Sequence, residues 1–227
     1  TPAEAIPRRF QLVARFTPPV NGTTEPYRAM LLHFPEREYS ELTIVTQDRP
    51  GLFAILAGVL ASAGLSIGGA RITTSSDGLA LDVFQISHAD RQEMVVDVDT
   101  WTHIYARLEE VLRGKRTLED ILRSNRSSSF LNKRSSRYGT DVEVDNNSSA
   151  NYTVIDITAP DRMGLLFSVT YTLFTLGLVI HLAKINTNVD HVLDVFYVTE
   201  RNGAKVANPE QLAGQLREQL QVVRGAA

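Results

Sequence analysis

The chain has 227 residues, a formal net charge of -3 at pH 7 and no cysteine. Without thiols it can form no disulfide, zinc–thiolate site or thiol nucleophile, and so small a net charge gives no general attraction to nucleic acid or to an anionic membrane. No apolar run approaches the roughly 20 residues of a membrane helix and no secretory signal opens the chain, so we expect a cytoplasmic protein without a membrane or nucleic-acid partner. The first residue, Thr1, is not a methionine, which indicates a piece of a longer protein.

The residues that precede the first strand predict a helix followed by a connector. The segment from Glu4 to Phe16 has moderate helical character, with Pro7 in the first turn, where proline is tolerated. The stretch that follows contains several prolines and is typical of irregular structure. We therefore separate residues 1–26 from the rest of the chain.

Residues 27–123 predict a unit of strands and helices. Apolar residues between Gly51 and Ala63 recur at i, i+3, i+4 and i+7, the pattern of a helix with one buried stripe, and Gly64 ends that helix. Ser75–Gly78 is a turn signal between two strand-like runs. In chain order we expect strands at Tyr27–Phe34 and Glu41–Thr46, the helix at Gly51–Ala63, hairpin strands at Ile67–Thr74 and Leu79–Ser87, and a closing helix at Trp101–Arg113.

The same pattern returns in the second half of the chain. Asp48–Phe53, with the sequence DRPGLF, is repeated as DRMGLLF at Asp161–Phe167. The spacing between the copies stays constant to the glycine that ends each helix, and then slips by one residue before a shared LDVF block at Leu81–Phe84 and Leu193–Phe196. The period is about double that of solenoid repeats, so the chain contains two copies of one small domain.

The second unit is predicted at residues 141–227, after a Ser/Arg-rich linker at 124–140. The linker has basic but no acidic residues, which leaves nucleic-acid contact as a remote option, yet it lacks the interleaved aromatics of such binders and is expected to be solvated. The predicted elements are strands at Asp141–Asp145 and Tyr152–Thr158, a helix at Gly164–Leu176, hairpin strands at Ile180–Thr187 and Val192–Thr199, and a helix at Pro209–Val223.

The element order predicts an α+β fold of two ferredoxin-like domains. Each would have an antiparallel four-stranded sheet with two helices on one face. No residues remain after the last helix of the second copy for a fourth strand, so the leading strand, Asp141–Asp145 in that copy, must fill its place. We therefore predict a permuted ββαββα order for both domains.

The repeated motif lies where a strand ends and a helix begins. The first backbone N–H groups of a helix lack internal partners and favour an anion, and glycine allows close approach to them. Asp48 and Asp161 add a carboxylate, so each corner offers groups for both ends of a free amino acid. A purely structural interpretation stays open: the aspartates could cap the helices, Pro50 could fit a first turn, and the glycines could simply permit the turn.

These residues resemble the ACT domain, a small ferredoxin-like regulatory module. The resemblance lies in the DRPGLF motif before a helix, the Gly-Leu-Ser-Ile that follows it and the hairpin. More narrowly, Ile155–Arg162, Ile180–Ile185 and Val192–Val198 resemble the C-terminal tandem of the bifunctional uridylyltransferase/uridylyl-removing enzyme family. The likeness covers nearly the whole chain except the linker, with Met163 in place of the usual proline.

The resemblance implies a regulatory role. In that family the tandem is taken to sense glutamine and to shift the enzyme from adding UMP to the PII protein toward removing it. The fragment has no catalytic motif and no cofactor of its own, whereas the parent nucleotidyltransferase, with its phosphohydrolase activity, would need Mg²⁺. The implied partners are glutamine, the parent's catalytic domains, PII indirectly and a second copy in a homodimer. The alternative is an interaction or dimerisation module that binds no metabolite.

An effector site of this kind would use the helix-start amides for a carboxylate and the motif aspartates for an ammonium group. The second strand of each copy would close the pocket. The expected effector-binding residues are Asp48, Arg49, Gly51, Leu52, Phe53, Ile67 and Gly68 in the first copy, and Asp161, Arg162, Gly164, Leu165, Leu166, Ile180 and His181 in the second.

Two further patterns predict contacts. A basic and an acidic residue, Arg71 with Asp82 and Lys184 with Asp194, would form a cross-strand ion pair in each hairpin, unless the aspartates instead face a ligand pocket. The second motif helix has an aromatic face of Phe167, Tyr171 and Phe174. We expect it to dock on the small face of the first, made by Ala54, Gly58 and Ala61, within the chain or between chains; the alternative is that it stays exposed or contacts a catalytic domain of the parent. The histidines show no metal-ligand spacing.

Overall fold

The computed structural model describes residues 5–16, 25–89, 93–117, 120, 123, 139–162, 164–186 and 191–222. The first unit has α1 (Ala5–Ala14), β1 (Tyr27–Phe34), the short 3-10 helix η1 (Pro35–Arg37), β2 (Tyr39–Gln47), α2 (Leu52–Ser62), β3 (Leu65–Thr74), β4 (Leu79–His88) and α3 (Val98–Leu112). The second has β5 (Asp141–Asp145), β6 (Thr153–Pro160), α5 (Leu165–Thr175), β7 (Leu178–Asn186), β8 (His191–Glu200) and α6 (Pro209–Val222). The predicted linker at 124–140 lies almost entirely outside the described residues, as does Met163.

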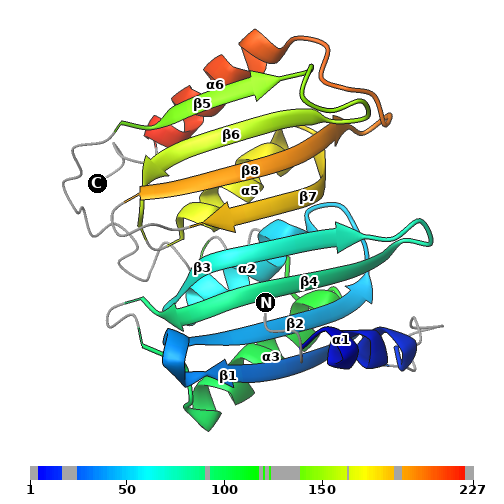
Figure 1. The fold of residues 1–227 in the computed structure, drawn as a ribbon, viewed down its shortest axis with the longest axis vertical. Helices are drawn as coiled ribbons and strands as arrows, with labels where there is room; N and C mark the ends of the chain where they lie inside the picture. Colours follow the sequence, from blue (N-terminus) through cyan, green and yellow to red (C-terminus); the bar gives the residue numbers. More distant parts are fainter. Residues whose placement is uncertain are drawn as a thin grey trace.

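The described strands form one antiparallel sheet in the order β1-β2-β4-β3-β7-β8-β6-β5 (Figure 1). The leading strand of each unit occupies an edge: β1 pairs with β2, and β5 pairs with β6 from Asp141 opposite Thr158 to Asp145 opposite Val154. The α+β class and the permuted ββαββα order are therefore confirmed, because Asp141–Asp145 is a paired strand.

The two units share their sheet through β3 and β7, which pair from Gly69 opposite Asn186 to Thr73 opposite Leu182. In Figure 1, α2, α3, α5 and α6 lie behind the sheet, and α1 lies in front of it. The helices α2 and α5 pack against each other across the junction. The predicted docking of these two helices thus occurs within the chain, and residues of both units form one apolar core, including Leu56 and Leu60 of α2 and Val169 and Leu173 of α5.

Helix α1 covers the other face of the sheet at β2. The Arg9 guanidinium donates to Glu41 Oε1 at 2.6 Å, and the Glu41 side chain is fully buried. A strand covered on both faces buries successive residues rather than alternate ones. This explains why every residue of β2 from Ser40 to Thr46 is buried.

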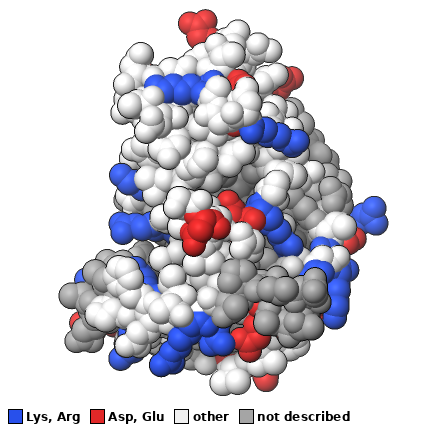
Figure 2. Space-filling model, turned by 90° about the vertical axis from the view of Figure 1, so that its right-hand side faces the viewer, with Lys and Arg blue, Asp and Glu red and all other residues white. Residues whose placement is uncertain are grey.

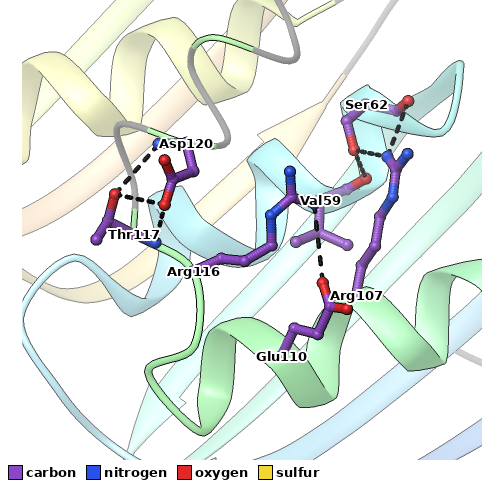
Figure 3. Close-up of polar contacts among 7 residues, drawn as sticks. All are labelled: Val59, Ser62, Arg107, Glu110, Arg116, Thr117 and Asp120. Atoms are coloured by element: carbon purple, nitrogen blue, oxygen red, sulfur yellow. Dashed lines mark hydrogen bonds and ion pairs between the residues drawn. The ribbon is translucent and has the colours of Figure 1, made fainter.

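Helix α3 is joined to the end of α2 by a set of polar contacts (Figure 3). Arg107 donates to the Ser62 hydroxyl at 2.6 Å and to its carbonyl at 3.3 Å, while that hydroxyl donates to Val59 O at 2.8 Å. The last carbonyls of a helix lack internal partners and favour a cation, so Arg107 stabilises the end of α2. Beyond α3, Asp120 accepts a hydrogen bond from Thr117 N at 2.8 Å.

The predicted cross-strand ion pairs are wrong. Asp82 lies opposite Ile72, and Arg71 lies opposite Val83. The ion pairs require two residues, Ser76 and Asp77, in the turn, but Ser75 N bonds to Leu79 O and leaves three between them. Neighbouring residues of a strand point to opposite faces, so this one-residue shift separates the exposed arginine from the buried aspartate. In the second hairpin Lys184 lies opposite Val195 and is likewise exposed, whereas Asp194 is buried.

The surface gives no sign of one dominant charge on the face drawn in Figure 2, where acidic and basic side chains are interspersed among neutral ones. Within the described residues, no helix combines the length and the apolar character needed to cross a bilayer.

Candidate functional site

Both repeated motifs form the same strand-to-helix corner. Gly51 precedes α2 with φ of 77° and Gly164 precedes α5 with φ of 72°, a left-handed conformation that glycine adopts without steric cost. Neither helix start has a side-chain cap, so the interpretation of the two motif aspartates as helix caps is wrong. Leu52 N donates to Arg49 O at 3.0 Å and Leu165 N to Arg162 O at 3.1 Å, so the amides that come next in each first turn are the ones that could meet an anion.

A pocket lies at the Gly164 corner, at the junction of the two units. The empty space there amounts to about 380 Å³ when open solvent is counted, but the space open to the centre of a water molecule is only about 20 Å³, so the pocket is small as it stands. From the first unit it is lined by Ala57, Ala61, Leu65, Ser66 and Ile67. From the second unit it is lined by Asp161, Arg162, Gly164, Leu165, Leu166, Phe167, Ile185, Val192 and Asp194.

Two carboxyl groups face this pocket. The Asp194 side chain is only 1% exposed, and its Oδ1 has no hydrogen-bond partner among the described residues. The pKa of Asp194 is raised to about 7, chiefly by burial; the Asn186 backbone opposes the rise, and the charge of Asp161 adds to it. A buried carboxylate with an unpartnered oxygen is costly to ionise, so a cationic group in the pocket would be well matched to Asp194 and Asp161.

The Gly51 corner holds the equivalent residues in structural contacts. Asp48 Oδ1 accepts from its neighbour Arg49 N at 2.8 Å, and its Oδ2 accepts from Thr74 Oγ1 at 3.3 Å. The Arg49 guanidinium donates to Val111 O at 2.6 Å and Leu112 O at 3.1 Å. Arg49 thus satisfies carbonyls at the end of α3, where a positive charge is favourable.

Asp82 is the first-unit counterpart of Asp194. Neither of its carboxylate oxygens has a hydrogen-bond partner among the described residues, although the Thr73 backbone lies near enough to lower its pKa in part. Burial chiefly, and then the charge of Asp48, hold the pKa of Asp82 well above its ordinary value. Each corner therefore places a buried aspartate of the hairpin near the aspartate of the motif.

The pocket unites some of the expected effector-binding residues but not all. Its lining includes Ile67, Asp161, Arg162, Gly164, Leu165 and Leu166. The remaining ones are not part of the lining: Asp48, Arg49, Gly51, Leu52, Phe53, Gly68, Ile180 and His181. His181 lies elsewhere in the sheet, with Nε2 2.9 Å from Thr199 Oγ1 and its ring 5.0 Å from that of Tyr152. Burial lowers the pKa of His181, and the charge of Asp48 opposes this shift.

Sequence reasoning did not assign the α2 residues Ala57 and Ala61 to the site, nor Ser66 of β3. Only their small size distinguishes them, because they come from the copy opposite the corner that they face. Asp194 was expected either in an ion pair or at a pocket, and its place in the lining agrees with the second interpretation. The described part of the chain contains no cluster of three His, Cys, Asp or Glu side chains that could hold a metal ion.

Comparisons with known proteins agree with this architecture. Residues 148–222 match the family model for the ACR family N-terminal ACT domain. The chain is 38% identical over 185 residues to a bifunctional uridylyltransferase/uridylyl-removing enzyme of Azospirillum brasilense, covering 81% of this chain and 20% of that protein. Proteins with the same description match from Rhodospirillum rubrum, at 37% identity over 82% of this chain and 20% of the relative, and from Rhodopseudomonas palustris, at 40% over 78% and 19%.

A solved structure of aspartate kinase from Synechocystis also matches, with a TM-score of 0.42 and 16% identity over 83% of this chain and 27% of that one. The likeness is too low to add to the argument. The chain spans about a fifth of the length of the curated relatives. Residues 148–222, which span most of the second unit, thus match an ACT-domain model, and over about 80% of its length the chain is similar to bifunctional uridylyltransferase/uridylyl-removing enzymes.

Proposed function

We propose that this chain is the effector-binding regulatory region of an enzyme that adds UMP to the PII protein and removes it, and that the effector is the free amino acid glutamine. The single observation that carries this proposal is the pocket at the Gly164 corner. There, the start of helix α5 lies beside two acidic side chains, Asp161 and Asp194.

This combination fits a zwitterion. The backbone amides of Gly164, Leu166 and Phe167 would bind the carboxylate, because the start of a helix carries partial positive charge and Leu165 N already donates to Arg162 O. The ammonium group would lie against Asp161 and Asp194, and its charge would offset the cost of burying Asp194 ionised. Ala57 and Ala61 face the helix start with side chains that end at Cβ, so a small movement of α2 would make room for an amino acid.

The pocket also provides a physical route for regulation. Its lining comes from α2 and β3 of the first unit and from the corner, β7 and β8 of the second. A ligand there would contact both units at once and would stabilise the arrangement to which it binds most tightly. In the parent enzyme this difference would bias Mg²⁺-dependent catalytic domains toward removal of UMP from PII.

The alternative function is an interaction module that binds no metabolite. It is favoured by the apolar packing of α2 on α5, which joins the two units without any ligand. In that case the two units would transmit a conformational change or join subunits, and the pocket would be only a gap in the packing.

Calorimetric titration of the chain with glutamine separates the two functions. We expect saturable heat with wild type, and loss of binding for Asp161→Ala and for Asp194→Asn. Glu143→Gln is the matched control, because Glu143 is an exposed acid on the edge strand β5, and it should bind as wild type does. No heat and no rise in melting temperature at millimolar glutamine would favour the interaction module.

A further inference from the structure

The two strand-to-helix corners are copies in sequence, but the helices that face them differ. Helices α2 and α5 have the same length, and the same spacing along the chain separates Gly51 from Gly164 and Ala61 from Phe174. Ala61 on α2 lines the pocket at the Gly164 corner. Its counterpart on α5 is therefore the much larger Phe174, which faces the other corner.

The Phe174 ring lies directly against Gly51. A Cβ atom built on Gly51 would lie 3.1 Å from Phe174 Cδ2, 3.2 Å from Cε2 and 3.4 Å from Cγ. These distances are tighter than nine in ten real Cβ contacts, so the ring closes the space above the glycine. Phe174 is itself held there, because it is partly buried and packs against the apolar core.

We propose that the chain binds one effector molecule, at the Gly164 corner, and that Phe174 plugs the equivalent Gly51 corner. This inference rests on the proposed function and adds to it the location and the number of effector sites. The Gly51 corner then has the backbone conformation of the Gly164 corner but serves only to connect β2 to α2.

A pair of reciprocal substitutions tests the plug, since they exchange the two counterparts. Phe174→Ala should open the Gly51 corner and raise the glutamine stoichiometry from one to two per chain. Ala61→Phe should fill the Gly164 corner and abolish binding to an otherwise folded chain. If Ala61→Phe does not fold, the smaller Ala61→Leu replaces it, with the melting curve as the check on folding.

Three calorimetric outcomes would overturn the inference. These are two sites in wild type, one site of unchanged affinity in Phe174→Ala, and unchanged binding in a folded Ala61→Phe or Ala61→Leu variant. A failure of the proposed function looks different, because then no variant binds glutamine at all.

Hydrogen exchange measured without any ligand tests the plug even in that case. Phe174→Ala should speed exchange of the amides at Phe53 and Ala54, in the first turn of α2, and leave those of Leu166 and Phe167 in α5 unchanged. Equal acceleration at both corners would mean general loosening of the junction and would overturn the plug. No acceleration at either corner would do the same.

Discussion

The Asp194 carboxyl group is buried, and when it is ionised its Oδ1 has no hydrogen-bond donor among the described residues. Its pKa is raised from 3.8 to about 7, so between these values the folded chain holds a proton that the unfolded chain releases. The free energy of unfolding must then fall as the pH rises from about 4 to about 7, and the loss persists above that range.

Replacement of Asp194 by Asn should therefore stabilise the ligand-free chain at pH 8. A pKa shift is equivalent to about 1.4 kcal/mol per unit, so the gain is on the order of a few kcal/mol, and it should shrink toward pH 5. Urea unfolding of both proteins at pH 5, 6.5 and 8 measures this difference. A stability gain that does not change with pH would contradict a buried titrating carboxylate, and Glu143→Gln provides the exposed control.

Arg49 acts on stability through the end of α3. Arg49→Ala should lower the free energy of unfolding by about 1–3 kcal/mol, because two carbonyls of α3 lose a charged donor in a half-buried site. Arg71→Ala is the matched control, since that side chain is exposed, and it should stay within about 0.5 kcal/mol of wild type. Urea unfolding measures the free energy of unfolding of both variants. Equal losses would rule out a stabilising role of Arg49 at the end of α3.

The starts and ends of helices set the shape of the corners, and the glycines there can be compared in pairs. Gly51 and Gly64 flank α2 with φ of 77° and 75°, but an added Cβ at Gly64 meets nothing within 4 Å. Alanine at either position should cost about 1–2 kcal/mol for the left-handed backbone. Gly51→Ala should cost more in wild type, because it also meets the Phe174 ring.

The excess cost at Gly51 should disappear when Phe174 is replaced by alanine. Thermal unfolding of the two single variants, of Phe174→Ala and of the double variants measures this coupling in a double-mutant cycle. If Gly51→Ala and Gly64→Ala cost the same in wild type, Phe174 does not press on the corner.

The elements themselves could be predicted from the sequence because their signals are local. The apolar period of α2, the glycines that follow α2 and α5, and the turn at Ser75–Gly78 placed most strands and helices within about two residues. The hairpin register could not be predicted, because Ser75 N bonds to Leu79 O and lengthens the turn. That single bond decides which face receives Asp82.

The candidate site was predictable only in part, for a similar reason. Asp161 and Gly164 belong to a motif that repeats in the chain and is visible in the sequence. Ala57 and Ala61 enter the pocket from the opposite copy, so their part depends on the pairing of β3 with β7. No local pattern specifies which sheet edges will join, and the packing of α2 on α5 settles it.

Two positive charges face each other where the two units join, in the pairing of β3 with β7. Arg71 and Lys184 are directly opposite in the pairing of β3 with β7, and both are exposed. Like charges directly opposite each other destabilise a sheet. Lys184 also lies over the Tyr197 ring, at 5.8 Å from its centroid.

Lys184→Glu should thus be more stable than Lys184→Gln by about 0.2–1 kcal/mol, because both lose the ring contact but only Glu gains an attraction to Arg71. Thermal unfolding at low salt measures the gap, and 1 M salt should reduce it. A gap of the same size in the Arg71→Ala background would show that the two charges do not meet across the junction.

Since β3 and β7 are joined by backbone hydrogen bonds, the two units cannot separate at this junction to admit a ligand without breaking the sheet. The pocket between α2 and the start of α5 is small, so while β3 and β7 stay paired, room for an amino acid would have to come from a movement of these helices. Binding of a ligand would then change the angle between α2 and α5 while the sheet stays fixed. Because Phe174 packs against Gly51 at only one of the two corners, the movement would differ between them.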